Sequence, residues 1–499
     1  MLISGLASVG SENRAIWVIS TVTGTLRLLR EGVWRAAISP DSSRIAFITH
    51  SRDQIWLMGA NGEEPRKILA AAEGRLFEQL AWSPTGQRLA FMTTSVGFDQ
   101  VAIESINPGE GNPVTLLSDQ RLNDFCWAPN GRVIYSLAEP PPNEYDSNLW
   151  EIHADPRTGK ASGKPRRITN WAGFGLRDLT FSADGKRLAL ISLRDQSDVY
   201  VGELKAKGAQ LANVRRLTFD ERIDWPGGWT GDGKVLFYSD RNGQLDIFRQ
   251  GVNEKTGEAV VTGPEEKRMP QPSPDGAWVL YLAWPKSGCC VSAPSGRLMR
   301  APVSGGQPEP VFEVKGYPGS AQVARWRDVI SARGHPDFRC PATTAAPCVV
   351  SELARDELVF TAFDPLRGRA REISRFRVDH YGASWDLSPD GSRIAFAQQE
   401  AGRAVIKIAP VAGGTQREIP LKGWSRLWSV AWSADGASLF ASIQTTRRSW
   451  LLHVTMNGEV RVLRQMTGSI ERPMASPDGR YLGFGERLAT ANAWIIENF

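Results

Sequence analysis

The sequence predicts an all-β protein built from β-propeller blades, and three observations carry this prediction. One ten-residue phrase recurs along the chain, it returns at a regular spacing, and the composition combines 18 Trp with 48 Gly. A repeat of 40 to 45 residues is the length of one four-stranded propeller blade. Abundant Trp and Gly suit many short strands that have aromatic cores and tight turns.

The phrase occurs nine times, and its Pro column falls at positions 40, 84, 129, 183, 231, 274, 389, 434 and 477. The copies are ISPDSSRIAF, WSPTGQRLAF, WAPNGRVIYS, FSADGKRLAL, WTGDGKVLFY, PSPDGAWVLY, LSPDGSRIAF, WSADGASLFA and ASPDGRYLGF. The spacings are 44, 45, 54, 48, 43, 115, 45 and 43 residues. The long gap has room for one blade without the phrase, for which CVVSE (348–352) and ELVFTAFD (357–364) supply strands, and for an insertion. We therefore expect about ten four-stranded units.

Each phrase predicts a chain reversal between the first and second strands of a blade. Pro40 fixes φ at the first corner, Asp41 tolerates the second, and Gly supplies a positive φ. The predicted turn glycines are Gly86, Gly131, Gly185, Gly233, Gly276, Gly391, Gly436 and Gly479. Third strands such as Gln54–Met58 and polar fourth strands such as Arg66–Leu69 complete the blades.

Ten units exceed the four to eight blades of one ring, so we expect two rings. Residues 1–35 contain partial blade strands that either close a ring or mark the start of a fragment. Residues 36–284 are predicted to form N-terminal blades, and 373–499 C-terminal blades. Between them, 285–372 hold a Cys-containing insertion and the blade without the phrase. If the N-terminal strand completes the last blade, an exposed sheet edge is removed.

The segment Arg216–Arg249, with its trailing Ser-Asp-Arg-Asn-Gly, resembles the PD40 or WD40-like repeat of TolB-type propellers. The stretches Phe363–Arg369 and Asn492–Phe499 are similar to the C-terminal propeller region of bacterial CadC-like transcriptional regulators and receptor-type serine/threonine kinases. In such proteins a winged-helix or kinase domain and a membrane segment precede the propeller. The resemblance implies a sensory or interaction domain outside the cytoplasm.

Charge and hydropathy exclude several other classes. The net charge is +5 and basic residues alternate with acidic ones, so no basic face for nucleic acid is expected. No apolar run reaches the roughly 18 residues of a membrane span. Met1–Gly10 lacks the features of a signal peptide, so a cytoplasmic location stays open beside a periplasmic one. The oligomeric state is not predicted.

The sequence contains no recognisable catalytic or metal motif. G-x-S-x-G, Walker A, H-E-x-x-H and EF-hand patterns are all missing, and the five His are far apart in the chain. We therefore predict no catalytic residue, no metal and no cofactor.

Four cysteines lie in the insertion: Cys289, Cys290, Cys340 and Cys348. Pinning an irregular insertion is a typical task of a disulfide, and it indicates an oxidising compartment. Adjacent cysteines rarely bond to each other, so we expect Cys289 or Cys290 to pair with Cys340 or Cys348. Free structural thiols and a metal site are the alternatives. Cys126 is predicted to be a buried apolar residue.

The loops that enter the first strands should lie at one mouth of each central channel, where mixed charges and aromatic side chains suit a peptide or protein partner. The candidate binding residues are Phe77, Glu78, Asp124, Arg177, Asp178, Asp224, Trp225, Tyr381, Trp424, Arg426 and Arg472. Alternatively, Trp225 and Trp424 pack beneath neighbouring blades and the charges are merely solvated.

The leading hypothesis is a non-catalytic TolB-like propeller that binds a protein or peptide as the sensory module of a bacterial signalling system. One alternative is a propeller enzyme or a peptidase accessory domain, a lyase or hydrolase that acts on a saccharide or peptide in the channel. The other is a purely structural scaffold.

Overall fold

The computed structural model describes residues 2–6, 14–20, 22–95, 100–140, 143, 146–285, 295–315, 336–354, 357–377, 384–400, 403–445 and 448–497. Their regular structure is β-strand, apart from one short 3-10 helix at Ala206–Gly208. The all-β prediction is confirmed. The chain divides into two compact units: unit 1 contains residues 1–194 and 490–499, and unit 2 contains residues 195–489.

Unit 1 contains four complete or nearly complete antiparallel sheets and part of a fifth. The first sheet has three strands and the next three have four strands each. Their strands are β1 Leu2–Leu6, β2 Arg14–Ile19 and β3 Leu26–Glu31; β4 Val33–Ile38, β5 Arg44–Thr49, β6 Gln54–Gly59 and β7 Arg66–Ala70; β8 Arg75–Trp82, β9 Leu89–Ser95, β10 Val101–Asn107 and β11 Glu110–Ser118; β12 Leu122–Trp127, β13 Arg132–Ala138, β14 Ser147–Ala154 and β15 Ala161–Arg167. The fifth sheet begins with β16 Gly175–Phe181.

Unit 2 contains five four-stranded sheets that lie in chain order. Their strands are β19 Asp224–Trp229, β20 Lys234–Ser239, β21 Asp246–Gly251 and β22 Glu258–Val261; β23 Glu266–Pro272, β24 Trp278–Trp284, β25 Ser295–Pro302 and β26 Glu309–Lys315; β27 Asp337–Arg339, β28 Cys348–Ala354, β29 Glu357–Asp364 and β30 Gly368–Arg377; β31 Trp385–Leu387, β32 Arg393–Glu400, β33 Arg403–Pro410 and β34 Arg417–Pro420; β35 Leu427–Trp432, β36 Ser438–Gln444, β37 Ser449–Thr455 and β38 Val460–Met466.

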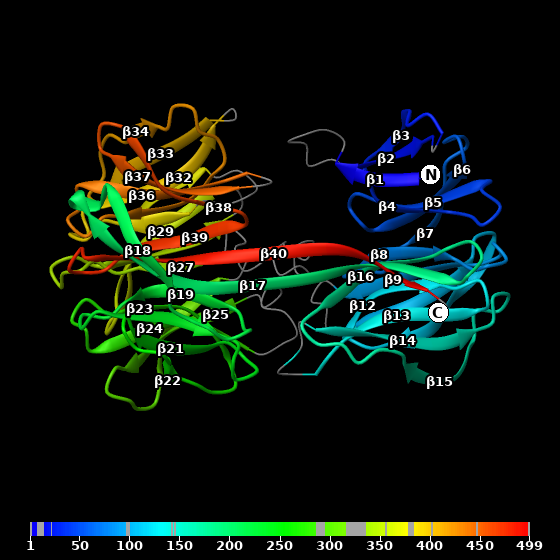
Figure 1. Ribbon diagram of the computed structural model, residues 1–499, viewed down its shortest axis with the longest axis horizontal. Coiled ribbons are helices and arrows are strands. Elements are labelled where there is room, and N and C mark those ends of the chain that lie inside the picture. Colours follow the sequence, from blue (N-terminus) through cyan, green and yellow to red (C-terminus); the bar gives the residue numbers. More distant parts are fainter. Residues whose placement is uncertain are drawn as a thin grey trace. The chain divides into compact units, whose positions relative to one another are not determined.

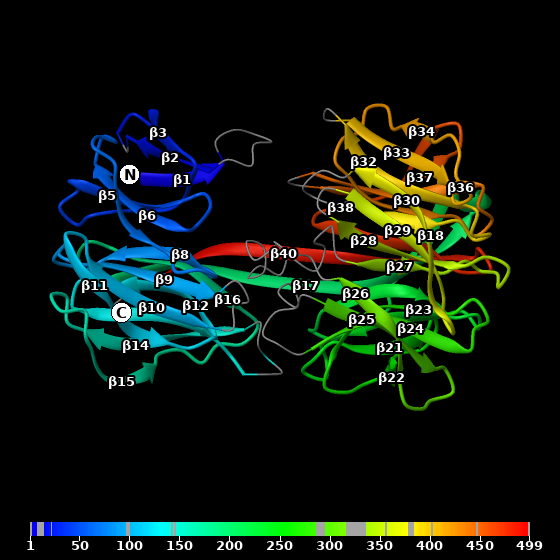
Figure 2. The same ribbon diagram turned by 180° about the vertical axis from the view of Figure 1, so that it is seen from behind.

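Two long strands complete a tenth sheet that is shared by the units. β17 spans Arg187–Lys205 and β40 spans Tyr481–Glu497, and the sheet order is β16-β17-β40-β39, with β18 also paired to β17. β18 is Gln210–Arg216 and β39 is Ser469–Ala475. Figures 1 and 2 show β17 in green and β40 in red, side by side along their length. In unit 1, β16 is the first strand of the blade, β17 the second and β40 the third. In unit 2, β39 is the first strand, β40 the second, β17 the third and β18 the fourth.

In unit 2 this arrangement completes a closed ring of six blades. Buried apolar clusters join each sheet to the next, from the β19 sheet through to the β35 sheet. Phe440 and Leu451 of the β35 sheet pack with Phe484 of β40. Val199 and Val201 of β17 pack with Phe237 of the β19 sheet, which closes the circle.

The structure corrects one expectation about closure. β1, β2 and β3 pair with one another, and within the described residues they do not complete the last blade. β17 and β18 do so instead, because β17 continues as an extended strand through Arg194–Ser197. The β1–β3 sheet packs on the next one through Ile16, Val33 and Phe47. The predicted domain limits at 35, 284 and 372 stay predictions.

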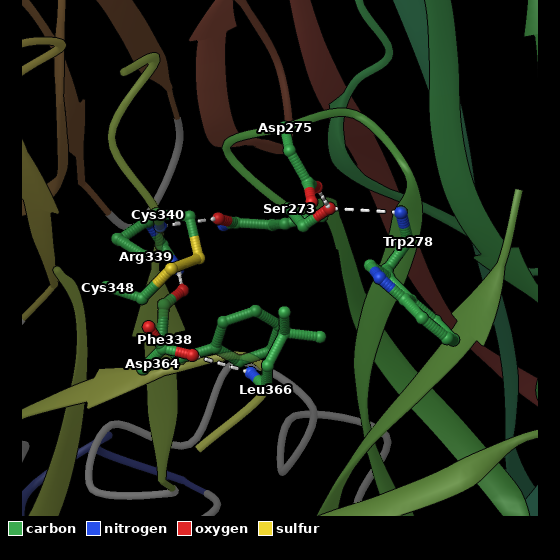
Figure 3. The surroundings of a disulfide bond; sticks show 10 residues. Ser273, Asp275, Trp278, Phe338, Arg339, Cys340, Cys348, Asp364 and Leu366 are labelled. Carbon is green, nitrogen blue, oxygen red and sulfur yellow. Dashed lines mark hydrogen bonds between the residues drawn. A yellow bond between two sulfur atoms is a disulfide. The ribbon is translucent and has the colours of Figure 1, made fainter. Parts of the chain in front are cut away.

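The recurring phrase lies at the corner between the first and second strands of nine blades. Seven of the nine copies share a turn geometry, which Ser273 and Asp275 illustrate in Figure 3: the hydroxyl oxygen accepts a hydrogen bond from a backbone amide, here Trp278 at 3.0 Å, and the hydroxyl donates to the Asp carboxylate. The turn glycines have φ of 64° to 83°. In the first copy Ser42 takes this left-handed position with φ 61°.

The blade without the phrase contains the disulfide, which joins Cys340 to Cys348 (Figure 3). These residues are at the ends of the loop between β27 and β28, where the other blades have the phrase. A disulfide was expected, but its pairing was not, because the loop brings its own two ends to a Cα–Cα distance of 4.2 Å. Cys289 and Cys290 lie outside the described residues. Cys126 is buried and has no disulfide partner, as predicted.

Candidate functional site

The innermost strands of both units carry a β-bulge near their middle. Eight of them, β4, β8, β12, β16, β19, β23, β35 and β39, have one extra residue relative to the second strand of the blade. A bulge redirects a side chain and often lies beside a functional site. Arg35, Asp124, Asp178 and Arg472 lie at four of these bulges, whereas β27 and β31 have none.

In unit 1 these side chains form an axial cluster of Arg35, Gln79, Asp124 and Asp178, which come from β4, β8, β12 and β16. Arg35 and Asp178 form an ion pair of 2.7 Å between Nη1 and Oδ1. Gln79 Nε2 donates to Asp124 Oδ1 at 2.7 Å, and Asp124 Oδ2 accepts the amide hydrogen of Leu179 at 3.3 Å. The cluster joins the inner strands of four sheets.

Solvent exposure differs strongly within this axial cluster. Asp124 is 4% exposed, and burial raises the pKa of its carboxyl group. The side chains of Arg35 and Asp178 are 27% and 40% exposed. Asp178 also has a left-handed backbone, with φ 52°. Arg35 and Asp178 are therefore accessible to solvent, whereas Asp124 is shielded from it and ties β12 to β8 and β16.

Beside this cluster, Glu78 forms an ion pair with Arg52, which is fully buried. Arg52 Nε donates to the Phe77 carbonyl at 3.3 Å, and its guanidinium lies over the Trp34 ring at 4.9 Å. Phe77 itself is 2% exposed and packs edge-on against Phe91. Phe77 is therefore a core residue of unit 1 whose side chain is shielded from solvent.

In unit 2 an axial cluster of Asp337, Arg339, Asp386 and Arg472 comes from β27, β31 and β39. Arg339 Nη1 lies 2.6 Å from Asp337 Oδ1, and its Nε lies 3.2 Å from Asp386 Oδ1. Burial opposes the charge of Arg339, but the two aspartates outweigh it and raise its pKa. Asp386 Oδ2 also accepts the amide hydrogen of Trp432 at 2.8 Å, which ties β31 to β35.

Arg472 is the member of this cluster with the weakest contact, because its Nη2 lies 3.9 Å from Asp337 Oδ2. Its side chain is 24% exposed, and its backbone is left-handed with φ 47°. Arg426, just before β35, is exposed and also left-handed, with φ 58°. Both arginines therefore hold strained backbone conformations while their charges remain accessible.

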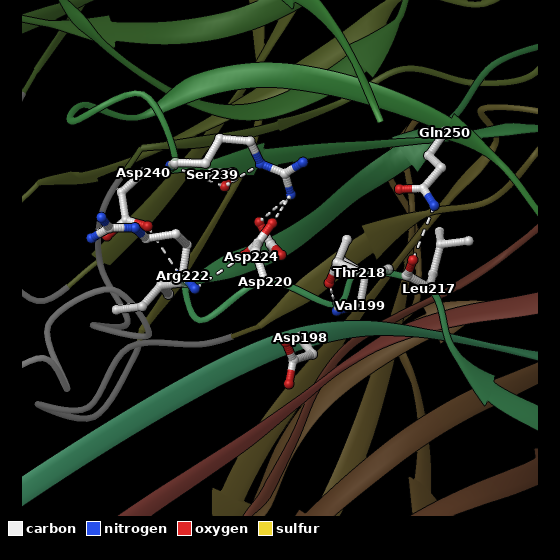
Figure 4. Close-up of polar contacts among 12 residues, drawn as sticks. Asp198, Val199, Leu217, Thr218, Asp220, Arg222, Asp224, Ser239, Asp240 and Gln250 are labelled. Carbon is white, nitrogen blue, oxygen red and sulfur yellow. Dashed lines mark hydrogen bonds and ion pairs between the residues drawn. The ribbon is translucent and has the colours of Figure 1, made fainter. Parts of the chain in front are cut away.

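Asp224 and Trp225 lie at the start of β19 but are buried. Asp224 is 0% exposed, and Figure 4 shows it beside Asp220 and Ser239. Arg241 Nη2 lies 3.0 Å from Asp224 and 2.8 Å from Asp220. Trp225, 2% exposed, stacks on Tyr238 of β20 in the same blade, with a centroid distance of 5.4 Å.

The pKa of Asp224 gives a testable dependence of stability on pH. Burial, partly offset by Arg241, raises this pKa to about 7 from an ordinary value of 3.8. Between these values the folded chain holds a proton that the unfolded chain releases, so stability falls as pH rises from about 4 to about 7. Asp198, whose pKa burial raises to about 6, acts in the same direction.

We expect Asp224→Asn to remove much of this loss, which corresponds to roughly 2–4 kcal/mol between pH 4 and pH 8. Urea unfolding across that range measures it. Asp155→Asn is the control, because backbone amides of Thr158 and Arg157 lower the pKa of Asp155 and its titration lies outside this window. An unchanged slope for Asp224→Asn contradicts the assignment.

The remaining predicted residues do not gather at one point. Trp424 is partly buried and packs edge-on against Trp450 at 5.5 Å. Arg177 lies on β16 next to Asp178. Tyr381 lies outside the described residues. Binding by the candidate residues therefore stays a prediction.

Sequence reasoning missed Arg35, Gln79, Asp337, Arg339 and Asp386. Arg35 lies five residues before the Pro position of its phrase, as Asp124 and Asp178 do, and that offset could have marked it; Asp386 lies three residues before Pro389. Asp337 and Arg339 precede a corner that lacks the phrase, so no repeat signal locates them. Within the described residues no group of three or more His, Cys, Asp or Glu could hold a metal ion. No helix of the described residues is long and apolar enough to cross a membrane.

Radial four-stranded sheets with bulged inner strands define a β-propeller protein. No family model matches the chain. It is 27% identical over 262 residues to an uncharacterised protein of Agrobacterium fabrum, covering 50% of this chain and 81% of the relative. It is 25% identical over 171 residues to the Tol-Pal system protein TolB of Francisella tularensis subsp. mediasiatica, covering 33% of this chain.

The chain is thus a β-propeller protein that is similar in sequence to TolB, as its repeat indicated. The matched region spans about a third of the TolB relative, 36% of its length. Among solved structures, a TolB-type protein from Agrobacterium tumefaciens aligns with a TM-score of 0.43 at 16% identity, covering 59% of this chain and 99% of that one.

Proposed function

We propose that the chain is a non-catalytic binding module that takes a protein or peptide at the axial mouths of its propellers. The observation that carries this proposal is the left-handed backbone of Asp178, Arg426 and Arg472. Strained conformations in residues other than Gly persist where the fold holds them, and they concentrate at ligand-binding positions. All three residues present charged side chains that are at least partly exposed.

The charge at unit 2 favours a ligand with carboxylate groups. Asp337 and Asp386 already pair with Arg339, which leaves the more loosely held Arg472 and the exposed Arg426 to receive an anion. Arg binds carboxylates with two parallel hydrogen bonds, which gives orientation as well as affinity. We therefore expect acidic side chains or a C-terminal carboxylate in the bound peptide.

We further propose a place outside the cytoplasm, in a bacterial signalling or envelope system. The Cys340–Cys348 disulfide supports an oxidising compartment. The similarity to a protein named for the Tol-Pal system supports the same placement.

Selection of a displayed random-peptide library on the purified chain tests the binding proposal. Enriched peptides should be acidic, and Arg472→Ala and Arg426→Ala should each weaken their binding by at least about tenfold, the loss of roughly one charge-assisted contact. Arg480→Ala is the matched control, since Arg480 is 73% exposed on the turn before β40. No enrichment, or equal binding by all three variants, overturns the proposal.

A further inference from the structure

The sheet of β16, β17 and β40 in unit 1 has an open edge. In unit 1, β17 is paired on both sides, by β16 and by β40. Among the described residues, no strand pairs with the other edge of β40 over residues 490–497. The β12–β15 sheet beside it has a fourth strand at this place.

Residues 491–497 correspond position by position to the third strand β14. In the β12–β15 sheet, Arg132 opens the second strand and lies opposite His153. In the open sheet, Arg187 opens the second strand and its side chain forms an ion pair with Glu497, and farther along the same two strands the Leu204 amide donates to the Arg480 carbonyl. This register aligns Trp494 with Trp150 and Asn492 with Asn148. Trp494 packs against Trp171 and Phe174, so it has the third-strand role.

The β14 strand shows how a fourth strand is held at this position. Asn148 Oδ1 accepts the Thr169 hydroxyl at 2.8 Å, and Thr169 Oγ1 accepts the amide hydrogen of Leu149 at 2.9 Å. Arg167 lies opposite Trp150, over its ring, with 5.9 Å to the centroid. Asn492, Ala493 and Trp494 repeat the groups on β40 that would make these contacts.

The open edge lacks the usual protection against pairing. Exposed edge strands in natural proteins carry charges or Pro that block another strand. Residues 490–496, Thr-Ala-Asn-Ala-Trp-Ile-Ile, contain neither. Ile495 is 65% exposed, whereas the aligned Glu151 is 6% exposed beneath Arg132 and Arg166.

We infer that this edge of unit 1 receives an antiparallel strand from a partner protein, which completes the blade by β-augmentation. The matching pattern is aliphatic–Arg–Ile or Leu–Thr. The aliphatic residue covers Ile495, Arg stacks on Trp494, and Thr bonds to Asn492. This edge is separate from the axial mouths, so the inference about it does not depend on the function proposed above.

Fluorescently labelled peptides test this inference on the full chain. The peptide of residues 160–169, Lys-Ala-Ser-Gly-Lys-Pro-Arg-Arg-Ile-Thr, copies the β15 strand. Its Arg166→Val version matches the pattern above, and we expect it to bind at least threefold more tightly than the copy. A Thr169→Val change in the same peptide should weaken binding at least threefold.

Two variants of the chain localise the site. Ile495→Pro removes an amide hydrogen from the open edge, because Ile495 aligns with Glu151, which lies opposite Arg166 of the fourth strand. We expect it to weaken binding more than tenfold with little change in melting temperature. Asn492→Ala keeps the test valid if Ile495→Pro does not fold. The loss of binding free energy caused by Asn492→Ala should not add to the loss caused by Thr169→Val in the peptide, because both changes remove the same hydrogen bond.

Three results overturn the inference. They are no binding of either peptide, equal binding by Ile495→Pro, and full additivity of the Asn492 and Thr169 changes. A fourth concerns the occupant: if the chain alone forms a dimer by light scattering and Ile495→Pro dissociates it, a second copy occupies the edge in place of a partner.

Discussion

Lys267→Met is expected to destabilise unit 2 by about 3–5 kcal/mol, the typical cost of leaving one partner of a buried ion pair alone. Lys267 on β23 and Asp246 on β21 have side chains only 4% and 2% exposed, with 2.8 Å between Nζ and Oδ1. Lys267 Nζ also donates to the carbonyls of Gly263 and Glu265 at 2.8 and 2.6 Å. All three ammonium hydrogens are used, and Met satisfies none of these acceptors.

Two companion variants make this result specific, all measured by urea unfolding. Lys407→Met is the same substitution at a pair whose acid, Glu418, is 55% exposed, and it should cost less than about 1 kcal/mol. Combining Lys267→Met with Asp246→Leu removes both charges and should recover part of the loss. If the two single Lys→Met changes cost the same, the Lys267–Asp246 contact is wrongly placed.

Gly391→Ala is expected to destabilise the chain by roughly 2–4 kcal/mol, from backbone strain and crowding together. Gly391 has φ 72°, and an added Cβ would lie 2.5 Å from the Cβ of Ala346. Ala346 belongs to the loop that the Cys340–Cys348 disulfide closes. That loop is also tied to the turn by the Ala342 amide, which donates to the Pro389 carbonyl at 2.8 Å. The loop therefore cannot move away cheaply.

Gly276→Ala separates strain from crowding. Gly276 has φ 70° in the same kind of turn, but an added Cβ would meet nothing within 4 Å. Its cost should be the backbone term alone, about 1–2 kcal/mol. Thermal unfolding of the two variants should therefore differ clearly. Equal melting temperatures would show that the disulfide loop does not pack on the Gly391 turn.

The blade architecture could be predicted from the sequence because it is local. Each Ser-Pro-Asp-Gly corner is set by residues within six positions, as Ser273, Asp275 and Trp278 show. The partner of β17 could not be predicted. The segment Ser192–Asp198 resembles the Thr49–Gln54 hairpin, yet it runs straight because β40 offers an equivalent strand from the far end of the chain.

The axial clusters could be predicted only in part, for the same reason. Asp124 and Asp178 lie at recognisable offsets from the phrase, so their proximity to the axis followed from the repeat. The Arg35–Asp178 pair joins residues 143 positions apart, and only ring geometry brings them together. Phe77 is buried in a cluster with Ile48 and Leu57 of the neighbouring blade, a contact that the sequence of a single strand does not show.

The most direct test of this fold asks which strands complete the last blade of unit 2. Val201 on β17 and Ile16 on β2 are both 0% exposed. Val201→Asp and Ile16→Asp therefore each place a charged side chain at a fully buried position, which makes them a matched pair of destabilising variants. Deuterium uptake of residues 469–487 is the measurement. We predict faster uptake in Val201→Asp and no change in Ile16→Asp. Faster uptake in Ile16→Asp alone would instead mean that the N-terminal strands close that ring.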